Sequence, residues 1–300
     1  MNFPKYPKVI TLGNPRTENA LTGEVIVQEK VDGSLFRFGI NENKELIIGS
    51  KNVIIQNEEQ YPLFKEGVEY ILSIKDKILK FSPNTFFYGE YLQKPKHNVL
   101  KYTKTPKNHI VLFDVLENSK YISREKLIEY AEILDLDVIP ELYRGVCTVE
   151  KIKELLNTDS YLGNEKVEGV VIKNYNQWIN LGGIVFPLFT KYVREQFKER
   201  HNVEWKIKSP KGELQTFVER FKTEARWEKA LIHLKEKGEL ENSVRDIGKL
   251  IKEVQKDIKE EESEYIKNHL YKIFIKDILQ TAIRGLPEWY KNKLLEKYEK

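Results

Sequence analysis

Apolar and polar positions alternate in short runs over the first two thirds of the chain. Seven segments are short, rich in β-branched or aromatic residues and bounded by turn-forming residues, which is the pattern of β-strands. Two of them, IVLFDVL and GVVIK, are apolar on both faces and predict buried strands. The predicted strands are residues 24–27, 34–40, 46–49, 85–91, 110–116, 169–173 and 186–190.

Helical periodicity marks one segment between these strands and most of the last third of the chain. In SREKLIEYAEIL, Ser123 is suited to cap the first turn, and the apolar residues fall on one face, namely Leu127, Tyr130, Ala131 and Leu134. The sequence SPKG at 209–212 interrupts the chain, and beyond it the apolar residues Leu214, Phe217, Val218 and Phe221 recur at helical spacing. The runs SVRDIGKLIKEVQKDI and YIKNHLYKIFIKDILQTAI repeat this pattern.

These patterns predict an α+β fold with two domains. Residues 1–208 form a domain of antiparallel sheets with flanking helices, and residues 209–300 form a small all-α domain. A chain of 300 residues with 40% hydrophobic content is long enough for one full core and a smaller second one.

The apolar content and the cysteine count of the sequence indicate in which cellular compartment to expect the protein. No window approaches the roughly 18–20 apolar residues of a membrane span, and the start MNFPKYPKVI lacks the apolar stretch of a secretory signal. The single cysteine, Cys147, has no companion for a disulfide or a zinc cluster. We therefore expect a soluble, cytoplasmic protein without a membrane partner.

Charge alone does not identify a nucleic-acid partner, because 50 Lys and Arg nearly balance 46 Asp and Glu and leave a net charge of +4. One local cluster, LQKPKHNVLKYTKTPK, is compatible either with a solvated loop or with a loop that contacts phosphates. Its basic residues are Lys94, Lys96, His97, Lys101, Lys104 and Lys107.

The segment EKVDGSLFRF contains the most informative motif, K-x-D-G, with Lys30, Asp32 and Gly33 between two predicted strands. Taken alone, the tetrapeptide is equally compatible with an ordinary hairpin and an exposed lysine. Further motifs follow it in order: GSKN with Ser50 and Lys51, FYGEYL with Glu90, VLFDVL with Phe113 and Asp114, EGVVIK with Glu168 and Lys173, and FTKYV with Lys191.

This ordered set resembles the covalent nucleotidyltransferase superfamily of ATP-dependent ligases and messenger-RNA capping enzymes, over about two thirds of the chain. The Ser-Leu after K-x-D-G, the G-E-Y-L form and the E-G-V-V-I-K form look most like the phage-type RNA ligases. The resemblance implies that residues 1–208 are an ATP-grasp-like adenylylation (nucleotidyltransferase) domain. It also implies that Lys30 takes AMP from ATP, passes it to a 5′-phosphate, and that a 3′-hydroxyl of RNA then displaces AMP.

The resemblance also implies roles for the other motif residues. Glu90 accepts hydrogen bonds from the ribose, and Phe113 stacks on the adenine, although without the neighbouring motifs a phenylalanine in such a strand is more often part of the core. Glu168 binds Mg²⁺ or Mn²⁺, and Lys173 and Lys191 neutralise phosphate charge. The nucleotide site further includes Glu29, Arg37 and Lys51, with Asp32 acting near the 3′-hydroxyl or a metal.

Nucleophilic attack by Lys30 requires a neutral amine, whereas a free lysine has a pKa of about 10.4. Partial burial, the nearby lysines Lys173 and Lys191, and a divalent metal would all disfavour the ammonium form. We therefore expect the pKa of Lys30 to be lowered. Arginine would not serve, because its guanidinium stays protonated.

The sequence departs from the family pattern at two positions. Many relatives carry two lysines in the last motif, and here the first of these positions is Phe189. Relatives also often have arginine or asparagine where this chain has Leu35, and Arg37 is a candidate to compensate.

Two alternatives remain open. A DNA ligase or capping guanylyltransferase usually carries an oligonucleotide-binding β-barrel after the last motif, where this chain is helical. A catalytically inactive nucleotide- or RNA-binding homologue would be expected to lack the nucleophile or the metal carboxylate. In the helical region we expect Phe217, Phe221 and Trp227 in the core and the lysines on a solvated face, with RNA gripping as a further hypothesis.

Overall fold

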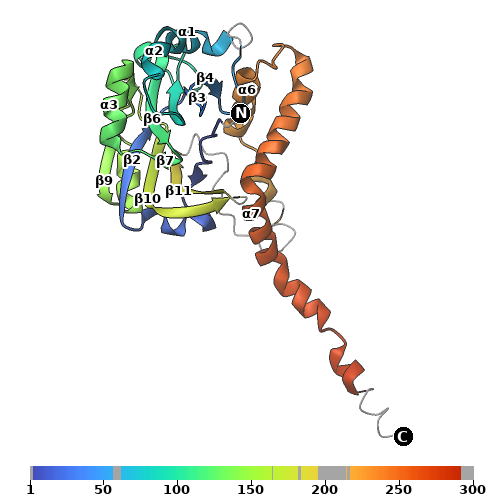
Figure 1. Ribbon diagram of the computed structural model, residues 1–300. Coiled ribbons are helices and arrows are strands. Elements are labelled where there is room, and N and C mark those ends of the chain that lie inside the picture. Colours follow the sequence, from blue (N-terminus) through green and yellow to red (C-terminus); the bar gives the residue numbers. More distant parts are fainter. Residues whose placement is uncertain are drawn as a thin grey trace.

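The computed structural model describes residues 3–56, 62–163, 165–181, 184–194, 214 and 217–291. Two β-sheets lie side by side in the first part of the chain, with helices on their outer faces, and two helices of the last part pack against one side (Figure 1). The fold is α+β with antiparallel sheets, flanking helices and a helical C-terminal region, as predicted.

The first sheet has the strand order β1-β11-β10-β2-β9, and all its pairs are antiparallel except β1 with β11. Its strands are β1 (Ile10–Thr11), β2 (Glu24–Lys30), β9 (Glu141–Val146), β10 (Gly169–Leu181) and β11 (Ile184–Val193). The second sheet has the order β4-β3-β5-β6-β7, with β8 parallel to β6. Its strands are β3 (Ser34–Ile40), β4 (Leu46–Ser50), β5 (Thr85–Tyr91), β6 (Ile110–Glu117), β7 (Lys120–Tyr121) and β8 (Asp137–Val138).

All seven predicted strands are confirmed, and β2, β10 and β11 are at least three residues longer than predicted. Beyond Lys173, β10 continues through NYNQWINL, whose polar residues give no apolar run for a sequence pattern to detect. The side chain of Asn174 accepts hydrogen bonds from the backbone amides of Asn176 and Gln177 at an irregularity in the β10–β11 pairing. The hairpin therefore persists through a segment without strand-like composition.

The segment Val31–Gly33 is not a hairpin turn, because β2 and β3 belong to different sheets. It carries the chain from the first sheet to the second, which puts the K-x-D-G motif at the junction between them. A side chain at Gly33 would lie 2.9 Å from the backbone oxygen of Tyr91 and 2.9 Å from Leu92 Cδ1. Glycine therefore allows this close approach of the crossover to β5.

Helices cover the outer faces of both sheets. The helix α3 (Arg124–Leu134) begins after Ser123, whose hydroxyl accepts from the amide of Lys126, and it buries Leu127, Ala131 and Leu134, as predicted. Further helices among the described residues are α1 (Lys65–Ser73), α2 (Lys75–Ile78), α4 (Val149–Leu155) and the 3₁₀ turns η1 (Pro15–Leu21), η3 (Pro62–Phe64) and η4 (Lys107–His109). The core between α1–α3 and the second sheet is rich in aromatic residues such as Phe36, Phe38 and Phe87.

The C-terminal region contains α6 (Glu224–Glu236), η6 (Val244–Asp246) and α7 (Ile247–Ala282). The two predicted helical runs form the single helix α7, whose far end projects away from the rest of the molecule (Figure 1). The predicted boundary at 208/209 lies outside the described residues, so the division into 1–208 and 209–300 stays a prediction. No described helix combines the length and the apolar composition of a membrane span.

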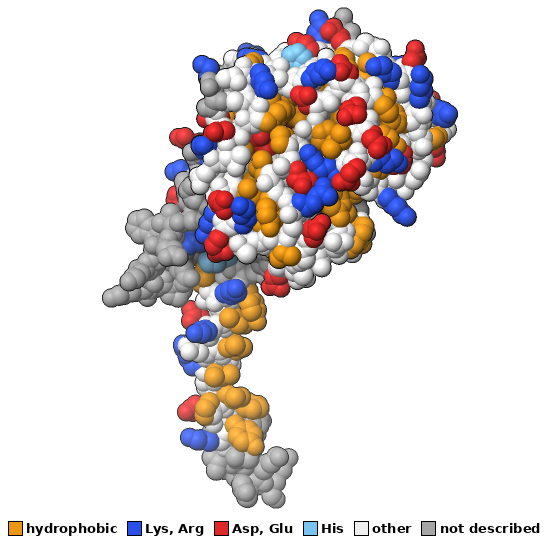
Figure 2. Space-filling model, turned by 90° about the vertical axis from the view of Figure 1, so that its left-hand side faces the viewer, with side chains coloured by type: hydrophobic (Ala, Val, Ile, Leu, Met, Phe, Trp, Pro, Cys, Tyr) orange, Lys and Arg blue, Asp and Glu red, His pale blue; other side chains and the backbone are white. Residues whose placement is uncertain are grey.

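The aromatic residues of this region divide between core and surface. Phe217 and Phe221 are buried as predicted, whereas the prediction for Trp227 was wrong, because its side chain is 47% exposed on α6. Along the projecting end of α7 and the residues that follow it, hydrophobic side chains are exposed and visible in Figure 2. These include Tyr271, Ile278, Leu279, Ile283, Leu286, Trp289 and Tyr290.

Candidate active site

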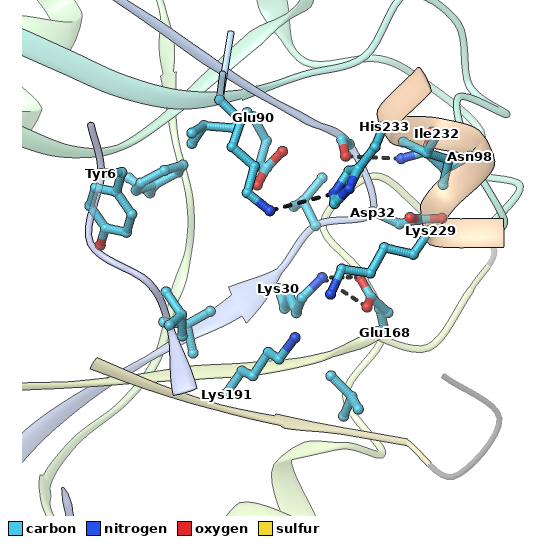
Figure 3. A pocket seen from close by; sticks show the side chains of 18 of the residues that line it. Tyr6, Lys30, Asp32, Glu90, Asn98, Glu168, Lys191, Lys229, Ile232 and His233 are labelled. Atoms are coloured by element: carbon cyan, nitrogen blue, oxygen red, sulfur yellow. Dashed lines mark hydrogen bonds and ion pairs between the residues drawn. The ribbon is translucent and has the colours of Figure 1, made fainter. Parts of the chain in front are cut away.

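The two sheets and α6 enclose a cavity of about 720 Å³, seen from close by in Figure 3. This volume lies within the range of small-molecule sites, about 300–1,000 Å³. Nine of the ten predicted site residues line the cavity, and Arg37 does not. The nine are Glu29, Lys30, Asp32, Lys51, Glu90, Phe113, Glu168, Lys173 and Lys191.

Lys30 and Glu168 form an ion pair at the centre of the cavity. Lys30 is the last residue of β2, and Glu168 directly precedes β10, where Gly169 pairs with Lys30 across the sheet. The Lys30 ammonium donates to both carboxylate oxygens of Glu168, at 2.8 and 2.6 Å. The side chains are 28% and 10% exposed, so the pair is reachable from the cavity.

The expectation of a lowered pKa for Lys30 was wrong for this state of the protein. Burial lowers the pKa, but the charge and hydrogen bonds of Glu168, with smaller contributions from Glu90 and Asp32, outweigh burial and raise the pKa above 10.5. We expected the positive charges of Lys173 and Lys191 to lower the pKa of Lys30, but neither is among the main causes of the shift. The carboxylate of Glu168 therefore holds Lys30 as an ammonium ion.

Glu90 projects from β5 into the cavity (Figure 3). Its oxygen Oε2 is buried without a hydrogen-bond partner among the described residues. Burial raises the pKa of Glu90 to about 8, Lys30 opposes this shift, and the charges of Glu236 and Glu168 add to it. A buried acceptor without a partner carries a desolvation cost, which a hydroxyl group from a ligand would relieve.

Two aromatic side chains form one wall of the cavity. Phe113 on β6 is 8% exposed, and the ring of Tyr6 stands edge-on to it at 4.9 Å between centroids. Tyr6 lies in an N-terminal segment without a motif, so no sequence pattern marked it as a site residue. Tyr6 also stacks on Phe189 at 5.9 Å, which shows why an apolar ring suits the position where relatives often carry lysine.

Lys173 is deeply buried, with its side chain 1% exposed. Its ammonium donates to the backbone oxygen of Phe113 at 2.6 Å and to Asp114 Oδ2 at 2.7 Å. Burial lowers the pKa of Lys173, although Asp114 opposes the shift. Because the ammonium is already paired beneath Phe113, this geometry gives it a structural role in the wall, and phosphate binding by Lys173 stays a prediction.

Asp32 fixes a loop that forms another wall of the cavity. Its Oδ2 accepts from the backbone amides of Val99 and Leu100, both at 2.7 Å. Asn98 donates to the backbone oxygen of Gly33 at 2.9 Å. The basic cluster is therefore attached to the K-x-D-G motif, a relationship that neither interpretation of the cluster anticipated.

Within this cluster, His97 is buried and its lysines are exposed. His97 accepts from the amide of Gln93 at Nδ1 and lies 2.9 Å from the Ser34 hydroxyl at Nε2. Burial lowers the pKa of His97 to about 4. Among the lysines of the cluster, Lys96 lines the cavity.

Arg37 and Glu29 both hydrogen-bond within the protein, and nucleotide binding by either residue stays a prediction. The Arg37 guanidinium donates to the backbone oxygens of Ser50, Phe3 and Pro4 at 2.8–2.9 Å, so it fastens the N-terminal segment to β3. The carboxylate of Glu29 accepts from the hydroxyl of Ser160 and, at 3.1 Å, from the amide of Tyr161. Both side chains therefore act as internal ties.

The helix α6 supplies cavity residues that the sequence analysis missed. Lys229, His233 and Glu236 line the cavity, and His233 Nε2 lies 3.4 Å from the ammonium of Lys51 (Figure 3). Burial raises the pKa of Glu236 to about 7, opposed by Ser34 and by neighbouring lysines. The polar face of this helix was predicted as a solvated surface, and only the tertiary arrangement places it over the cavity.

The carboxylates that line the cavity are suited to a metal ion that takes its other ligands from water and a substrate. Among the described residues, no three Asp, Glu, His or Cys side chains are grouped to hold an ion. Mg²⁺ is commonly bound by one or two carboxylates, with water and substrate phosphates as its other ligands. Glu168, with Asp32 close enough to influence its pKa, is suited to this arrangement.

Several solved ligases match this chain at low sequence identity and with TM-scores below 0.5. An RNA ligase from Naegleria gruberi with PPi matches with 17% identity and a TM-score of 0.47, over 63% of this chain and 56% of that one. A variant of that ligase with ATP and Mn matches with 16% identity and a TM-score of 0.48, over the same shares. A protein from Aquifex aeolicus assigned as an ATP-dependent DNA ligase matches with 19% identity and a TM-score of 0.45, over 95% of this chain and 68% of that one.

The matched region thus spans little more than half of the Naegleria ligase. No curated protein matches the chain. The RNA ligase family model, in contrast, matches residues 23–193, more than half of the sequence. This range contains Lys30, Glu90, Phe113, Glu168 and Lys191. The chain therefore belongs to the RNA ligase family.

Proposed function

We propose that this ligase joins RNA ends through a covalent lysyl-AMP intermediate, with Lys30 as the nucleophile and ATP as the AMP donor. The observation that supports this most strongly is the Lys30–Glu168 pair, which lines a cavity that also offers the buried oxygen of Glu90 and the aromatic wall of Phe113. Membership of the RNA ligase family supports RNA as the polynucleotide.

In the first step, the neutral amine of Lys30 attacks the α-phosphorus of ATP. A nitrogen–phosphorus bond forms, the bond from the α-phosphorus to the bridging oxygen breaks, and the electron pair leaves on pyrophosphate while the nitrogen loses a proton. The aromatic wall holds the adenine and Glu90 the ribose, which leaves the α-phosphate beside Lys30. Lys191 lines the same part of the cavity and balances the negative charge.

Glu168 controls the charge of the nucleophile. In the pair described above it holds Lys30 as an ammonium ion. A divalent cation bound to the nucleotide phosphates would also bind Glu168, and this cation would withdraw electron density from the phosphate. With the Glu168 carboxylate bound to the cation, burial would dominate and lower the pKa of Lys30.

The later steps reuse the same cavity. An oxygen of the 5′-phosphate attacks the phosphorus of lysyl-AMP, the nitrogen–phosphorus bond breaks, and Lys30 recovers its electron pair and a proton. The 3′-hydroxyl then attacks the 5′-phosphorus, the phosphodiester forms, the hydroxyl proton is lost, and AMP leaves.

Sealing of defined strands tests the proposal. The full chain is incubated with magnesium, ATP or GTP, and 5′-phosphate and 3′-hydroxyl strands of RNA or DNA, as single strands and across a nick. Joined RNA that depends on ATP is the expected product. Joining of DNA alone would favour a DNA ligase, guanylylated RNA from GTP would favour a capping enzyme, and no product from any strand would favour an inactive homologue.

A further inference from the structure

The helix α6 forms a roof over the cavity that contains Lys30. Its residues Glu228, Lys229, Ile232, His233 and Glu236 line this cavity. The following helix is also attached to the N-terminal segment, because the Lys8 ammonium donates to the backbone oxygen of Glu260 at 2.8 Å. The helical region therefore completes the cavity.

We propose that Lys229 binds the β- and γ-phosphates of ATP, and then the departing pyrophosphate, when Lys30 attacks. This inference rests on the proposed function. It makes the helical region part of the adenylylation site, in addition to any contact with the polynucleotide.

The order of residues across the cavity supports this role. In Figure 3, Tyr6 lies on one side, Lys229 on the opposite side, and Lys30 between them. A nucleotide with its base against Tyr6 and Phe113 and its α-phosphate beside Lys30 would extend its remaining phosphates toward α6. Lys51 and Lys229 both line this cavity.

The lysine charges around the cavity also support a phosphate site beside α6. Desolvation lowers the pKa of Lys51 most, and the positive charges of Lys229 and, to a smaller extent, Lys191 lower it further, while Glu261 and Glu236 oppose the shift. Three ammonium groups from β11, the end of β4 and α6 thus influence one part of the cavity. A diphosphate group placed among them would relieve their mutual repulsion.

Lys229 is held in place by carboxylates that have other partners. Its ammonium lies 2.7 Å from Asp257 Oδ1 and 3.0 Å from Glu261 Oε2, and its side chain is 18% exposed. Asp257 also pairs with the buried guanidinium of Arg226. Arg226 would therefore still balance Asp257 when the Lys229 ammonium turns toward a phosphate.

The test compares Lys229→Met with Lys235→Met in the full chain. Lys235 is an exposed lysine of the same helix that does not line the cavity. Three quantities are measured: the rate of Lys30 labelling as a function of ATP concentration, the discharge of the label by pyrophosphate, and the sealing of RNA that already carries a 5′-adenylyl group. The last reaction involves neither ATP nor pyrophosphate.

We expect Lys229→Met to reduce labelling efficiency and pyrophosphate discharge about tenfold or more, with a higher KM for ATP. Sealing of pre-adenylylated RNA should stay within about twofold of the wild type, and Lys235→Met should match the wild type in all three assays. Lys229→Arg, which keeps the charge, should recover part of the labelling.

Unchanged labelling with impaired sealing would overturn the inference and assign Lys229 to the polynucleotide. Equal losses in all assays, with a lower Tm and no recovery in Lys229→Arg, would also overturn it, because they would indicate a purely structural role. A wild-type protein without any label would refute the proposed function itself, which separates that failure from a failure at Lys229.

Discussion

The ammonium of Lys30 and the carboxylate of Glu168 meet through two hydrogen bonds, although 138 residues separate them in the sequence. The pairing of β2 with β10 brings them together, with Gly169 opposite Lys30. A side chain at Gly169 would lie 2.6 Å from the backbone oxygen of Tyr192, so glycine is required for β11 to pack at this point. Backbone geometry thus fixes the pair, and its charge balance determines the reactivity of the amine.

Replacing Glu168 by glutamine should lower the pKa of Lys30. Burial, which lowers the pKa, remains, while the charge that raises it is removed. Each unit of decrease raises the neutral fraction of a mostly protonated amine about tenfold. We expect an amine-reactive ester to modify Lys30 faster in Glu168→Gln than in the wild type near pH 9, as measured by peptide mass spectrometry. Glu154→Gln, an exposed control, should change nothing; an unchanged or slower reaction in Glu168→Gln would contradict the account.

Glu90→Gln should stabilise the protein increasingly as the pH rises. Burial raises the pKa of Glu90 to about 8. Protonated Glu90 therefore contributes fully to the folding stability of the protein below the ordinary pKa of 4.5, and this contribution is lost as the pH rises through 8. Glutamine cannot ionise. We expect the Tm of Glu90→Gln to exceed that of the wild type by a few degrees near pH 9 and by less near pH 5. A difference independent of pH, or equal to that of the exposed control Glu132→Gln, would disprove the burial of this charge.

Asp32→Ala should release the loop that carries Asn98 and Val99. Two backbone amides lose their shared acceptor, and an unpaired buried donor costs about 1–3 kcal/mol. We expect the free energy of unfolding in urea to fall by about 2 kcal/mol or more. Hydrogen exchange should accelerate at Val99 and Leu100, and less so in Asp32→Asn, which keeps one acceptor oxygen. Unchanged exchange at both amides would show that Asp32 does not hold the loop.

Arg226→Met should loosen α6 from α7. The guanidinium is fully buried and pairs with Asp257 and, at 2.8 Å, with Glu262. Removing one side of a buried ion pair costs about 3–5 kcal/mol, because the remaining charges are left buried. We expect faster hydrogen exchange in α6 and in the adjoining half of α7, with the two sheets unaffected. Arg245→Met, at an exposed position, is the control, and equal protection of α6 in both variants would rule out this pair as the tie.

The sequence predicted the strands because their composition and boundaries are locally determined. Apolar runs bounded by turn residues marked β3 and β5 to the residue, and Ser123 marked the start of α3. The motif order also predicted nine residues that meet in the cavity. Order along the chain was informative here because the strands of the two sheets bring these motifs together around one cavity.

Features that depend on long-range packing could not be predicted. The pKa of Lys30 depends on Glu168 at hydrogen-bonding distance, and no such distance can be read from a sequence pattern. Arg37 was predicted to bind phosphates, but in the structure it donates to the backbone oxygens of Phe3 and Pro4, acceptors that no sequence pattern indicates. The cavity residues of α6 are polar residues on an amphipathic helix, a pattern that solvated helices share.

The most direct test of the central claim is to locate the covalent AMP. The full chain is incubated with magnesium and α-labelled ATP, denatured, digested and sequenced by mass spectrometry, beside Lys30→Ala and Lys30→Arg. We predict one adenylyl group on Lys30 in the wild type and none in either variant, since arginine keeps the charge but stays protonated. An adenylyl group on another residue, or labelling that persists in Lys30→Ala, would contradict Lys30 as the nucleophile.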